Sequence, residues 1–388
     1  MINWIHFRQQ YLELFFLTIN GQNFTLKSKA LFPYRVKKAE VLINQKFTNL
    51  IYEYTKIRLS IYPIINNNYR APLIDVIAIL ISIKEQIYTE NNQKIVRTET
   101  VEVQQLADTK VITNKNVFQL SRFFNRKLKK YIYSSFVQGS VATEDYTRFS
   151  DFDTFIILKK NAIQDKDDFL SFMIENIKSS KYLYRFDPYQ HHRNWICHQE
   201  DLKCYDQSIL PVEVIIHGRL IQGKKTIKFN LINSNDSILY HANIGLISLR
   251  HKIESGYYLK NMWHLKDFIS TLLLFPVILL ELKNNYVYKR ESFELARKEF
   301  LFSDNEWKAI DVATEIRSIW SIDFNFRHQL SRLLLLYLNN NTLLYQDVAK
   351  KYGERIPEDI LNIINESKFI SHVEQFIRRS TLIIEEYK

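Results

Sequence analysis

Apolar residues recur along the chain with two different spacings, and the change from one to the other indicates an α+β fold. From residue 136 to 158, two short apolar runs flank a polar segment, the first ending at Gly139-Ser140 and the second covering Phe155–Leu158. Such runs, bounded by turn residues, are typical of buried strands. A further run, Trp195–His198, is predicted as a third strand. From Ser237 onward, apolar positions recur every three or four residues, which predicts an all-helical C-terminal domain.

Other segments are predicted from the same patterns. Helical spacing is found in Leu73–Tyr88, Asn116–Lys130, Phe169–Ile177, Trp307–Trp320, Arg327–Tyr337 and Ile356–Ile384. Phe268–Leu280 is predicted as one buried helix, too short to cross a bilayer. Alternation over residues 95–103 favours a strand, whereas prolines and asparagines favour a loop over Ile61–Pro72. Leu210–Ile216 is either a strand or the start of a buried helix.

The candidate chemistry lies between the first two predicted strands. Asp151 and Asp153 are two residues apart at the start of a strand, so their side chains project to the same face. Two neighbouring carboxylates repel each other, and a divalent cation between them removes that cost. Replacing either by asparagine is therefore expected to preserve or raise stability without metal. The turn at Gly139-Ser140 lacks a Cβ at its first residue, so its backbone N–H groups can approach a phosphate.

This order of features resembles the nucleotidyltransferase superfamily typified by DNA polymerase beta, which includes bacterial minimal nucleotidyltransferases. The resemblance covers roughly residues 115–220. It implies a nucleotidyltransferase-like mixed sheet flanked by helices, within an α+β chain of three parts. These are a basic N-terminal region (1–114), a catalytic core (115–235) and a helical C-terminal domain (236–388). It also implies that Gly139 and Ser140 bind the nucleotide, and that Asp151 and Asp153 are catalytic and bind Mg²⁺.

Members of the family usually have a third metal-binding carboxylate, and the sequence offers three candidates. Asp201 and Glu200 follow the predicted Trp195–His198 strand, and Glu213 lies within an apolar segment. Asp201 is preferred as the third catalytic and metal-binding residue, ahead of Glu213 and Glu200. Each carboxylate could instead be a surface group or a helix cap.

The resemblance implies Mg²⁺-dependent transfer of a nucleoside monophosphate from a nucleoside triphosphate to a hydroxyl acceptor, with release of pyrophosphate. A small-molecule or protein acceptor is favoured over nucleic acid, because the basic residues are dispersed and no nucleic-acid-binding motif is found. The alternatives are a catalytically degenerate module that binds a nucleotide or partner, and a transferase that acts on nucleic-acid ends. No P-loop and no Gly-x-Ser-x-Gly elbow is present.

Other polar residues carry weaker predictions. His191-His192 is interpreted as part of the cleft or as a polar loop, because zinc requires three or four ligands. Lys252, Lys260 and Lys266 lie on the helical stretch after the core, where a family member can direct a lysine at the triphosphate. A solvated helix face is the simpler interpretation of each.

Composition and charge limit the number of domains, the kinds of cysteine site and the expected compartment. The 388 residues are enough for two or three domains. The net charge of +11 resides in residues 1–130, with 20 Lys and Arg against 9 Asp and Glu, while the remainder has 33 of each. Two cysteines seven residues apart exclude a disulfide framework and a thiolate zinc site. The start lacks the pattern of a secretory signal, so the expected compartment is the cytoplasm, and the abundance of Asn, Ile, Lys and Tyr suggests an AT-rich bacterial genome.

Overall fold

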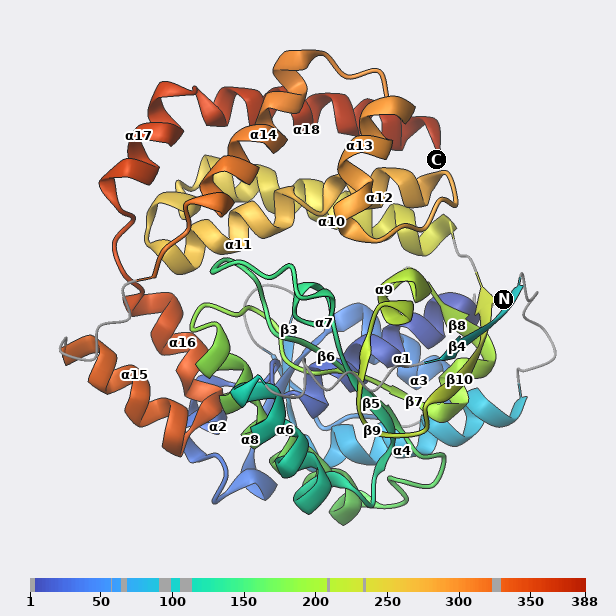
Figure 1. Cartoon of the computed structure of the whole chain (residues 1–388). Coiled ribbons are helices and arrows are strands. Elements are labelled where there is room, and N and C mark those ends of the chain that lie inside the picture. The colour runs from blue at the N-terminus through green and yellow to red at the C-terminus, as the bar shows by residue number, and fades with distance from the viewer. Residues whose placement is uncertain are drawn as a thin grey trace.

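A four-stranded mixed sheet lies at the centre of the computed structural model (Figure 1). The structure describes residues 4–56, 58–63, 68–90, 99–104, 114–207, 210–232, 235–322 and 329–388. The strands are β5 (Ile132–Gln138), β6 (Asp153–Leu158), β7 (Trp195–His198) and β9 (Arg219–Gly223), in the order β7-β6-β5-β9. β5 is antiparallel to β6 and β9, whereas β6 and β7 are parallel. The predicted strands and the α+β class are confirmed.

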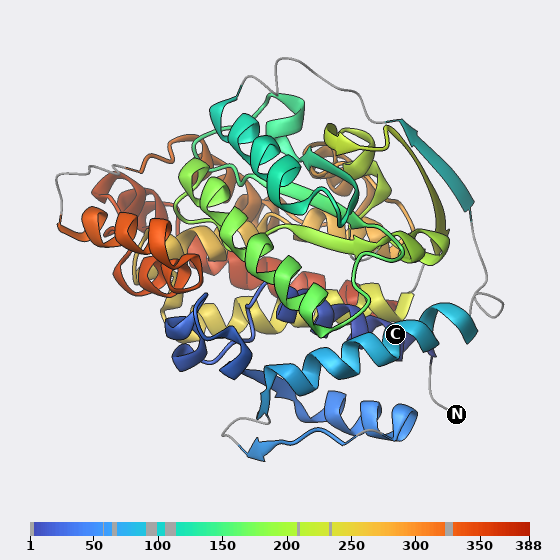
Figure 2. The same ribbon diagram turned by 90° about the horizontal axis from the view of Figure 1, so that it is seen from below.

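Both faces of this sheet are buried, because successive strand residues point to opposite sides. Ile156 and Leu158 join one hydrophobic cluster, whereas Phe155 and Ile157 join another. Helices α6 (Lys115–Phe123), α8 (Lys166–Phe186) and α4 (Leu73–Glu90) contribute to the first cluster and cover that face of the sheet (Figure 2). The second cluster faces a smaller sheet of β4 (Glu99–Gln104), β10 (Thr226–Ile232) and β8 (Tyr205–Asp206). Apolar strands in the sequence therefore correspond to a sheet covered on both sides.

The N-terminal residues share the core of the central sheet. Their elements are α1 (Trp4–Ile19), α2 (Leu26–Leu31), β1 (Glu40–Asn44), α3 (Gln45–Thr55), β2 (Tyr62–Pro63), β3 (Asn68–Pro72) and α4. Side chains from α1 and α4 join those from α8 in a single cluster. The loop predicted over residues 61–72 was wrong in part, because β3 pairs with both β1 and β2. Of the strand predicted over residues 95–103, residues 95–98 lie outside the described part of the chain, and β4 begins at Glu99.

A layer of helices covers the site end of the sheet (Figure 1). It consists of α10 (Asn235–Glu254), α11 (Met262–Leu272), α12 (Phe275–Leu282), α13 (Lys289–Glu299), α14 (Asp304–Ser318), α17 (Glu358–Glu366) and α18 (Phe369–Glu386). The single helix predicted over 268–280 is two helices, because Pro276 sits in the first turn of α12 and cannot continue α11. Residues 356–384 likewise form α17 and α18. The alternative left open at Leu210–Ile216 resolves to a short helix, α9 (Val212–Ile216).

Two C-terminal helices leave this layer. α15 (Gln329–Asn340) and α16 (Thr342–Tyr352) lie beside α8 and α2 rather than over the sheet (Figure 1). Asn341, between them, donates to the carbonyl oxygens of Lys29 and Phe32. The helical C-terminal region therefore covers the sheet and also contacts the N-terminal region from the side.

A buried hydrogen-bond network joins α1, α8 and the central strands. The Asn194 amide donates to Asn176 Oδ1 at 2.7 Å, and the Asn176 amide donates to Asn20 Oδ1 at 3.0 Å. The hydroxyl of Thr154, one residue beyond Asp153, donates to Asn194 Oδ1 at 2.5 Å. All four residues are fully buried. Because a buried amide is stable only when bonded, the network fixes how α1 and α8 dock behind the start of β6.

Asn176→Ala is expected to lower the free energy of unfolding by about 1–3 kcal/mol, because it leaves the Asn20 and Asn194 side chains and the Ile19 carbonyl with fewer partners. Ser180→Ala is the matched control on the same helix, since its buried hydroxyl has no partner among the described residues. Urea unfolding of both variants checks this. Equal midpoints for the two would contradict the role of the network.

Candidate functional site

The glycine turn and the two aspartates meet at one end of the sheet. Gln138, the last residue of β5, pairs with Asp153, the first residue of β6. Gly139 follows with a φ of +66°, and a Cβ built on it would lie 2.9 Å from Asp153 Oδ2. Any side chain at this position would displace the carboxylate and strain the backbone. The sequence elements predicted to bind phosphate and metal are therefore in contact.

Both aspartates face cationic side chains from other segments. His192 Nε2 lies 2.9 Å from Asp153 Oδ1 and 3.7 Å from Asp151 Oδ2. Lys266 Nζ, on α11, lies 2.8 Å from Asp151 Oδ1 and 2.6 Å from Asp187 Oδ2. The Lys266 side chain is fully buried, and that of Asp187 is 1% exposed. The helical layer thus contributes a buried cation to the end of the sheet.

The electrostatics of the group follow from this pairing. Burial works to raise the pKa of Asp151, but Lys266 and His192 hold it well below its usual value. Burial opposes protonation of His192, yet Asp153 and Asp151 raise its pKa well above the ordinary one. Burial, together with the Asp151 carboxylate, raises the pKa of Asp187 to about 7 despite Lys266. Asp187 therefore accepts a proton more readily than Asp151 does.

Further cations approach from α13 and α14. Burial and then the Arg317 guanidinium lower the pKa of Lys289 to about 8, while the Asp151 and Asp153 carboxylates work to raise it. The Arg317 guanidinium lies 6.0 Å from the ring centre of Phe149, and the Lys266 ammonium lies 5.1 Å from the same centre. Within the described part of the chain, no carboxylate forms an ion pair with Lys289 or Arg317. An anion at this place would stabilise both cations.

The first turn of α13 also touches the segment after the glycine turn. Tyr288 Oη lies 3.3 Å from the hydroxyl of Thr143, at the end of the short helix α7 (Ser140–Thr143). Arg290 pairs with Asp145 at 3.3 Å. Lys289 is therefore held between two contacts that anchor its helix to the segment beginning at Ser140.

The preferred third carboxylate, Asp201, lies elsewhere, and this corrects the expectation. β7 runs parallel to β6, with Trp195 beside Phe155 and His198 beside Leu158. Residues after His198 therefore lie at the opposite end of β6 from Asp153, about 17 Å away at ~3.3 Å per residue. There the Asp201 carboxylate accepts from Arg8 at 3.1 Å and from Tyr88 at 2.7 Å. It is a buried partner of α1 and α4.

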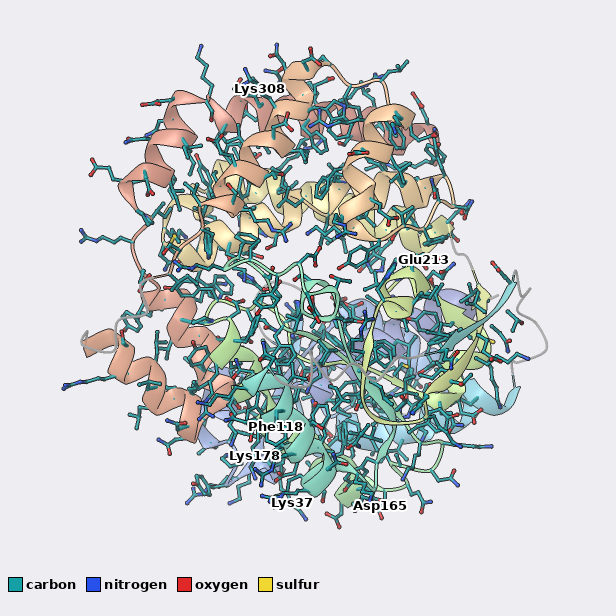
Figure 3. The ribbon with its side chains drawn as sticks, viewed as in Figure 1. Lys37, Phe118, Asp165, Lys178, Glu213 and Lys308 are labelled. Carbon is teal, nitrogen blue, oxygen red and sulfur yellow. The ribbon has the colours of Figure 1, made fainter. Side chains whose placement is uncertain are left out.

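The other two candidates are not brought to the aspartates either. Glu200, in the turn Gln199–Cys204 beside Asp201, pairs with Lys203 at 2.6 Å and Lys160 at 3.8 Å. Glu213 is half-buried at the start of α9 (Figure 3), and among the described residues it makes no ion pair with the groups around Asp151 and Asp153. The side chains that contact the two aspartates are instead those of His192 and Lys266, and Asp187 lies on the far side of Lys266.

The sequence analysis did not identify Asp187 or Lys289 as site residues, and it preferred a solvated position for Lys266. Asp187 lies before a proline, a pattern typical of a turn rather than of a catalytic site, and Lys289 carries no local signal at all. Lys266 was assigned to a solvated face but is fully buried in the site. Of the other two lysines, Lys252 pairs with Asp267 at 2.9 Å, and Lys260 remains exposed. His191, unlike His192, is directed at the Trp263 carbonyl oxygen at 3.1 Å.

The donor set suits a divalent cation held partly by substrate. Mg²⁺ is usually bound through one or two carboxylates together with phosphate oxygens and water. Asp151 and Asp153 supply two carboxylates on one edge, and the glycine turn lies directly against the Asp153 carboxylate. No group of three or more metal-ligating side chains is found among the described residues. The residues fit Mg²⁺ bound with a nucleotide better than a metal site built from protein alone.

Comparison with known proteins agrees with this geometry. Residues 118–191 match the family model described as a nucleotidyltransferase domain. The matched segment contains the glycine turn, both aspartates and Asp187, but ends before His192 and the helical layer. No curated protein and no solved structure matches the chain. Across the described residues, no helix combines the length and apolar character needed to cross a membrane.

Because Asp151 is paired with the buried Lys266, repulsion between carboxylates no longer decides the stability of the site; the loss of the cation does. Lys266→Met leaves Asp151 and Asp187 facing each other without their cation, so we expect a loss of about 3–5 kcal/mol in the free energy of unfolding. The loss should be greater at pH 8 than at pH 6. Lys266 keeps the pKa of Asp187 from rising above about 7, so without it the pKa is higher, and the variant still loses stability as pH rises from 7 to 8 where the wild type no longer does.

Urea unfolding at both pH values measures this effect. The double variant Lys266→Met/Asp187→Asn removes one of the two carboxylate charges that lack a cation, and it should recover part of the loss. A Lys266→Met protein as stable as the wild type at pH 8 would refute the assigned pairing.

Proposed function

Because the chain carries a nucleotidyltransferase domain, we propose that it transfers a nucleoside monophosphate from a nucleoside triphosphate to a hydroxyl acceptor and releases pyrophosphate. The observation that carries this proposal is the contact between the glycine turn and the paired aspartates. A phosphate bound at Gly139 and Ser140 would lie beside Asp153. Nucleotidyl transfer requires this juxtaposition, because the reacting phosphorus must lie next to the metal-binding carboxylates.

Each site residue has a defined role in this proposal. Asp151 and Asp153 would hold Mg²⁺, which neutralises phosphate charge and lowers the pKa of the attacking hydroxyl. The backbone at Gly139-Ser140 would bind the triphosphate, and Lys289 with Arg317 would neutralise its remaining charge. Asp187 is a positioning residue, since it reaches Asp151 through Lys266.

The alternative is a degenerate module that binds a nucleotide without transferring it. One observation favours it: Lys266 and His192 already neutralise the aspartates, and Asp201 does not join them. We prefer transfer because both aspartates remain partly exposed, at 21% and 26% of their side chains. His192 is also only partly buried, so it can withdraw when a cation arrives. Release of pyrophosphate from labelled nucleoside triphosphates with Mg²⁺ distinguishes the two.

Asp153→Asn is expected to reduce pyrophosphate release by at least about a thousandfold, because it removes one of two charges that bind the metal. Asp201→Asn is the control: it should lose stability through the unpaired Arg8 but retain turnover when folded. Turnover is measured on protein shown by circular dichroism to be folded. Inactivity of a folded Asp201→Asn, with activity of Asp153→Asn, would overturn the assignment.

Binding of the triphosphate should depend on the charge of Lys289. Its pKa of about 8 means that the ammonium is lost as pH rises through that value, so affinity for a nucleoside triphosphate with Mg²⁺ should fall between pH 7 and pH 9. Lys289→Met should weaken binding about tenfold at pH 7, or about 1.4 kcal/mol, and flatten this dependence. Lys298→Met, exposed on the same helix, should do neither. Calorimetry at several pH values checks both, and identical pH profiles for wild type and Lys289→Met would count against the contact.

A further inference from the structure

A set of cations gathers on the outer side of α6 and α8. Lys178, Lys181 and Arg185 are three and four residues apart, so they share one face of α8. α6 packs along this helix, and Arg185 donates to Gln119 on α6 at 3.5 Å. Arg122, one turn further along α6, is also exposed. We call Arg122, Lys178, Lys181 and Arg185, with the aromatic rings between them, the basic surface.

These cations are poorly neutralised by the protein itself. Lys178 pairs with Glu175 at 2.7 Å, whereas the described residues show no ion pair for Arg122, Lys181 or Arg185. Burial, followed by Arg185, lowers the pKa of Lys181, and Lys178 acts in the same direction, while the Glu175 carboxylate only partly opposes them. Like charges this close repel each other, so an anion lying across them would be bound favourably.

Aromatic rings lie between the cations. The Phe118 side chain is 48% exposed, and the Arg122 guanidinium lies 5.7 Å from its ring centre. The Lys181 ammonium lies 5.0 Å from the ring of Tyr182 and 5.7 Å from that of Phe123. Figure 3 labels Phe118 and Lys178 near each other, on the side of the core away from the helical layer. Exposed rings among unpaired cations are suited to stacking bases and contacting phosphates of one strand.

The basic surface leads to the catalytic end of the sheet. From Lys178 to Asp187, α8 advances about 14 Å at ~1.5 Å per residue, and Asp187 contacts Lys266 in the site. Phe186 packs edge-on against Tyr146 at 5.6 Å between ring centres. Tyr146 is half-exposed in the segment that joins the glycine turn to Asp151. The face of α8 that carries these cations therefore leads toward the end of the sheet where the aspartates lie, past Arg185, which also donates to Asn339 on α15 at 3.1 Å.

We propose that the basic surface binds a single-stranded nucleic acid and presents its terminal hydroxyl to the site as the acceptor. Binding follows from this surface alone, whereas the role as acceptor rests on the proposed transferase function. In the transfer, the hydroxyl oxygen bonds to the α-phosphorus of the nucleoside triphosphate. The bond from that phosphorus to the bridging oxygen breaks, pyrophosphate leaves with the electron pair, and the hydroxyl proton passes to water.

Binding is tested with fluorescent twelve-residue RNA and DNA strands of mixed sequence, titrated at several salt concentrations. For wild-type protein, log affinity should fall linearly with log salt, with a slope of about −0.7 for each phosphate contacted. Lys181→Glu/Arg185→Glu should weaken binding at least tenfold and flatten the slope by about 1.4, the value for two contacts. Phe118→Ala should weaken binding about tenfold with little change in slope, because it removes stacking rather than charge.

Lys127→Glu/Lys129→Glu is the matched control, with the same charge change on exposed residues beyond the far end of α6. An equal loss in this control would show general charge attraction and overturn the basic surface. So would binding to vesicles of anionic lipid in place of either strand. Preference for RNA or for DNA identifies the strand, and either preference supports the proposal.

The acceptor role is tested by incubating each bound strand with labelled nucleoside triphosphate and Mg²⁺. A strand lengthened by one labelled nucleotide, with loss of labelling in Lys181→Glu/Arg185→Glu, is the expected result. Tight binding without lengthening, while pyrophosphate is released with another acceptor, would overturn the acceptor role alone. Absence of pyrophosphate with every acceptor would instead refute the transferase function.

Discussion

The arrangement of this protein depends on neutralising the carboxylates that its own fold concentrates at one strand end. Asp151 lies just before β6 and Asp153 begins it, and Asp187 adds a third acid, whose side chain is buried. Such a group is stable only with cations close by. Lys266 arrives from the helical layer and His192 from the segment before β7. The contact that joins the helices to the sheet is therefore the same contact that forms the site.

This pairing also explains how one site can be stable alone and receptive to a charged ligand. Lys266 is fully buried and holds the layer in place, whereas His192 is partly exposed and can be replaced. Lys289 and Arg317 face the aspartates from α13 and α14 without carboxylate partners of their own among the described residues. A metal-bound triphosphate brings both the cation that the aspartates require and the anion that these two residues require. The metal ion thus complements the aspartates, and the phosphates complement Lys289 and Arg317.

The charged groups of the site are paired within the chain, whereas those of the basic surface are not paired among the described residues. At the strand end, acids are matched by cations from the same chain. On α6 and α8, Arg122, Lys181 and Arg185 have no ion-pair partner in the part of the chain that the structure describes, and they lie among aromatic rings. An exposed cation costs little in water, so stability does not require this cluster to be neutralised. Its arrangement is better explained by a ligand that carries a row of negative charges, and α8 connects that row to the site.

The local pattern of the sequence determined the strands, most helices, and the pairing of Gly139 with Asp151 and Asp153, because these depend on residues within about twenty positions of one another. It could not determine which distant groups join them. Asp201 was misplaced because the direction of β7, parallel to β6, decides which end of the strand its residues occupy. Lys266 is 115 residues from Asp151, and Lys289 carries no periodic signal, so only the packing of the helical layer brings them to the site. The basic residues look dispersed along the chain because α6 and α8 are separated by two strands, and tertiary contact alone makes them one surface.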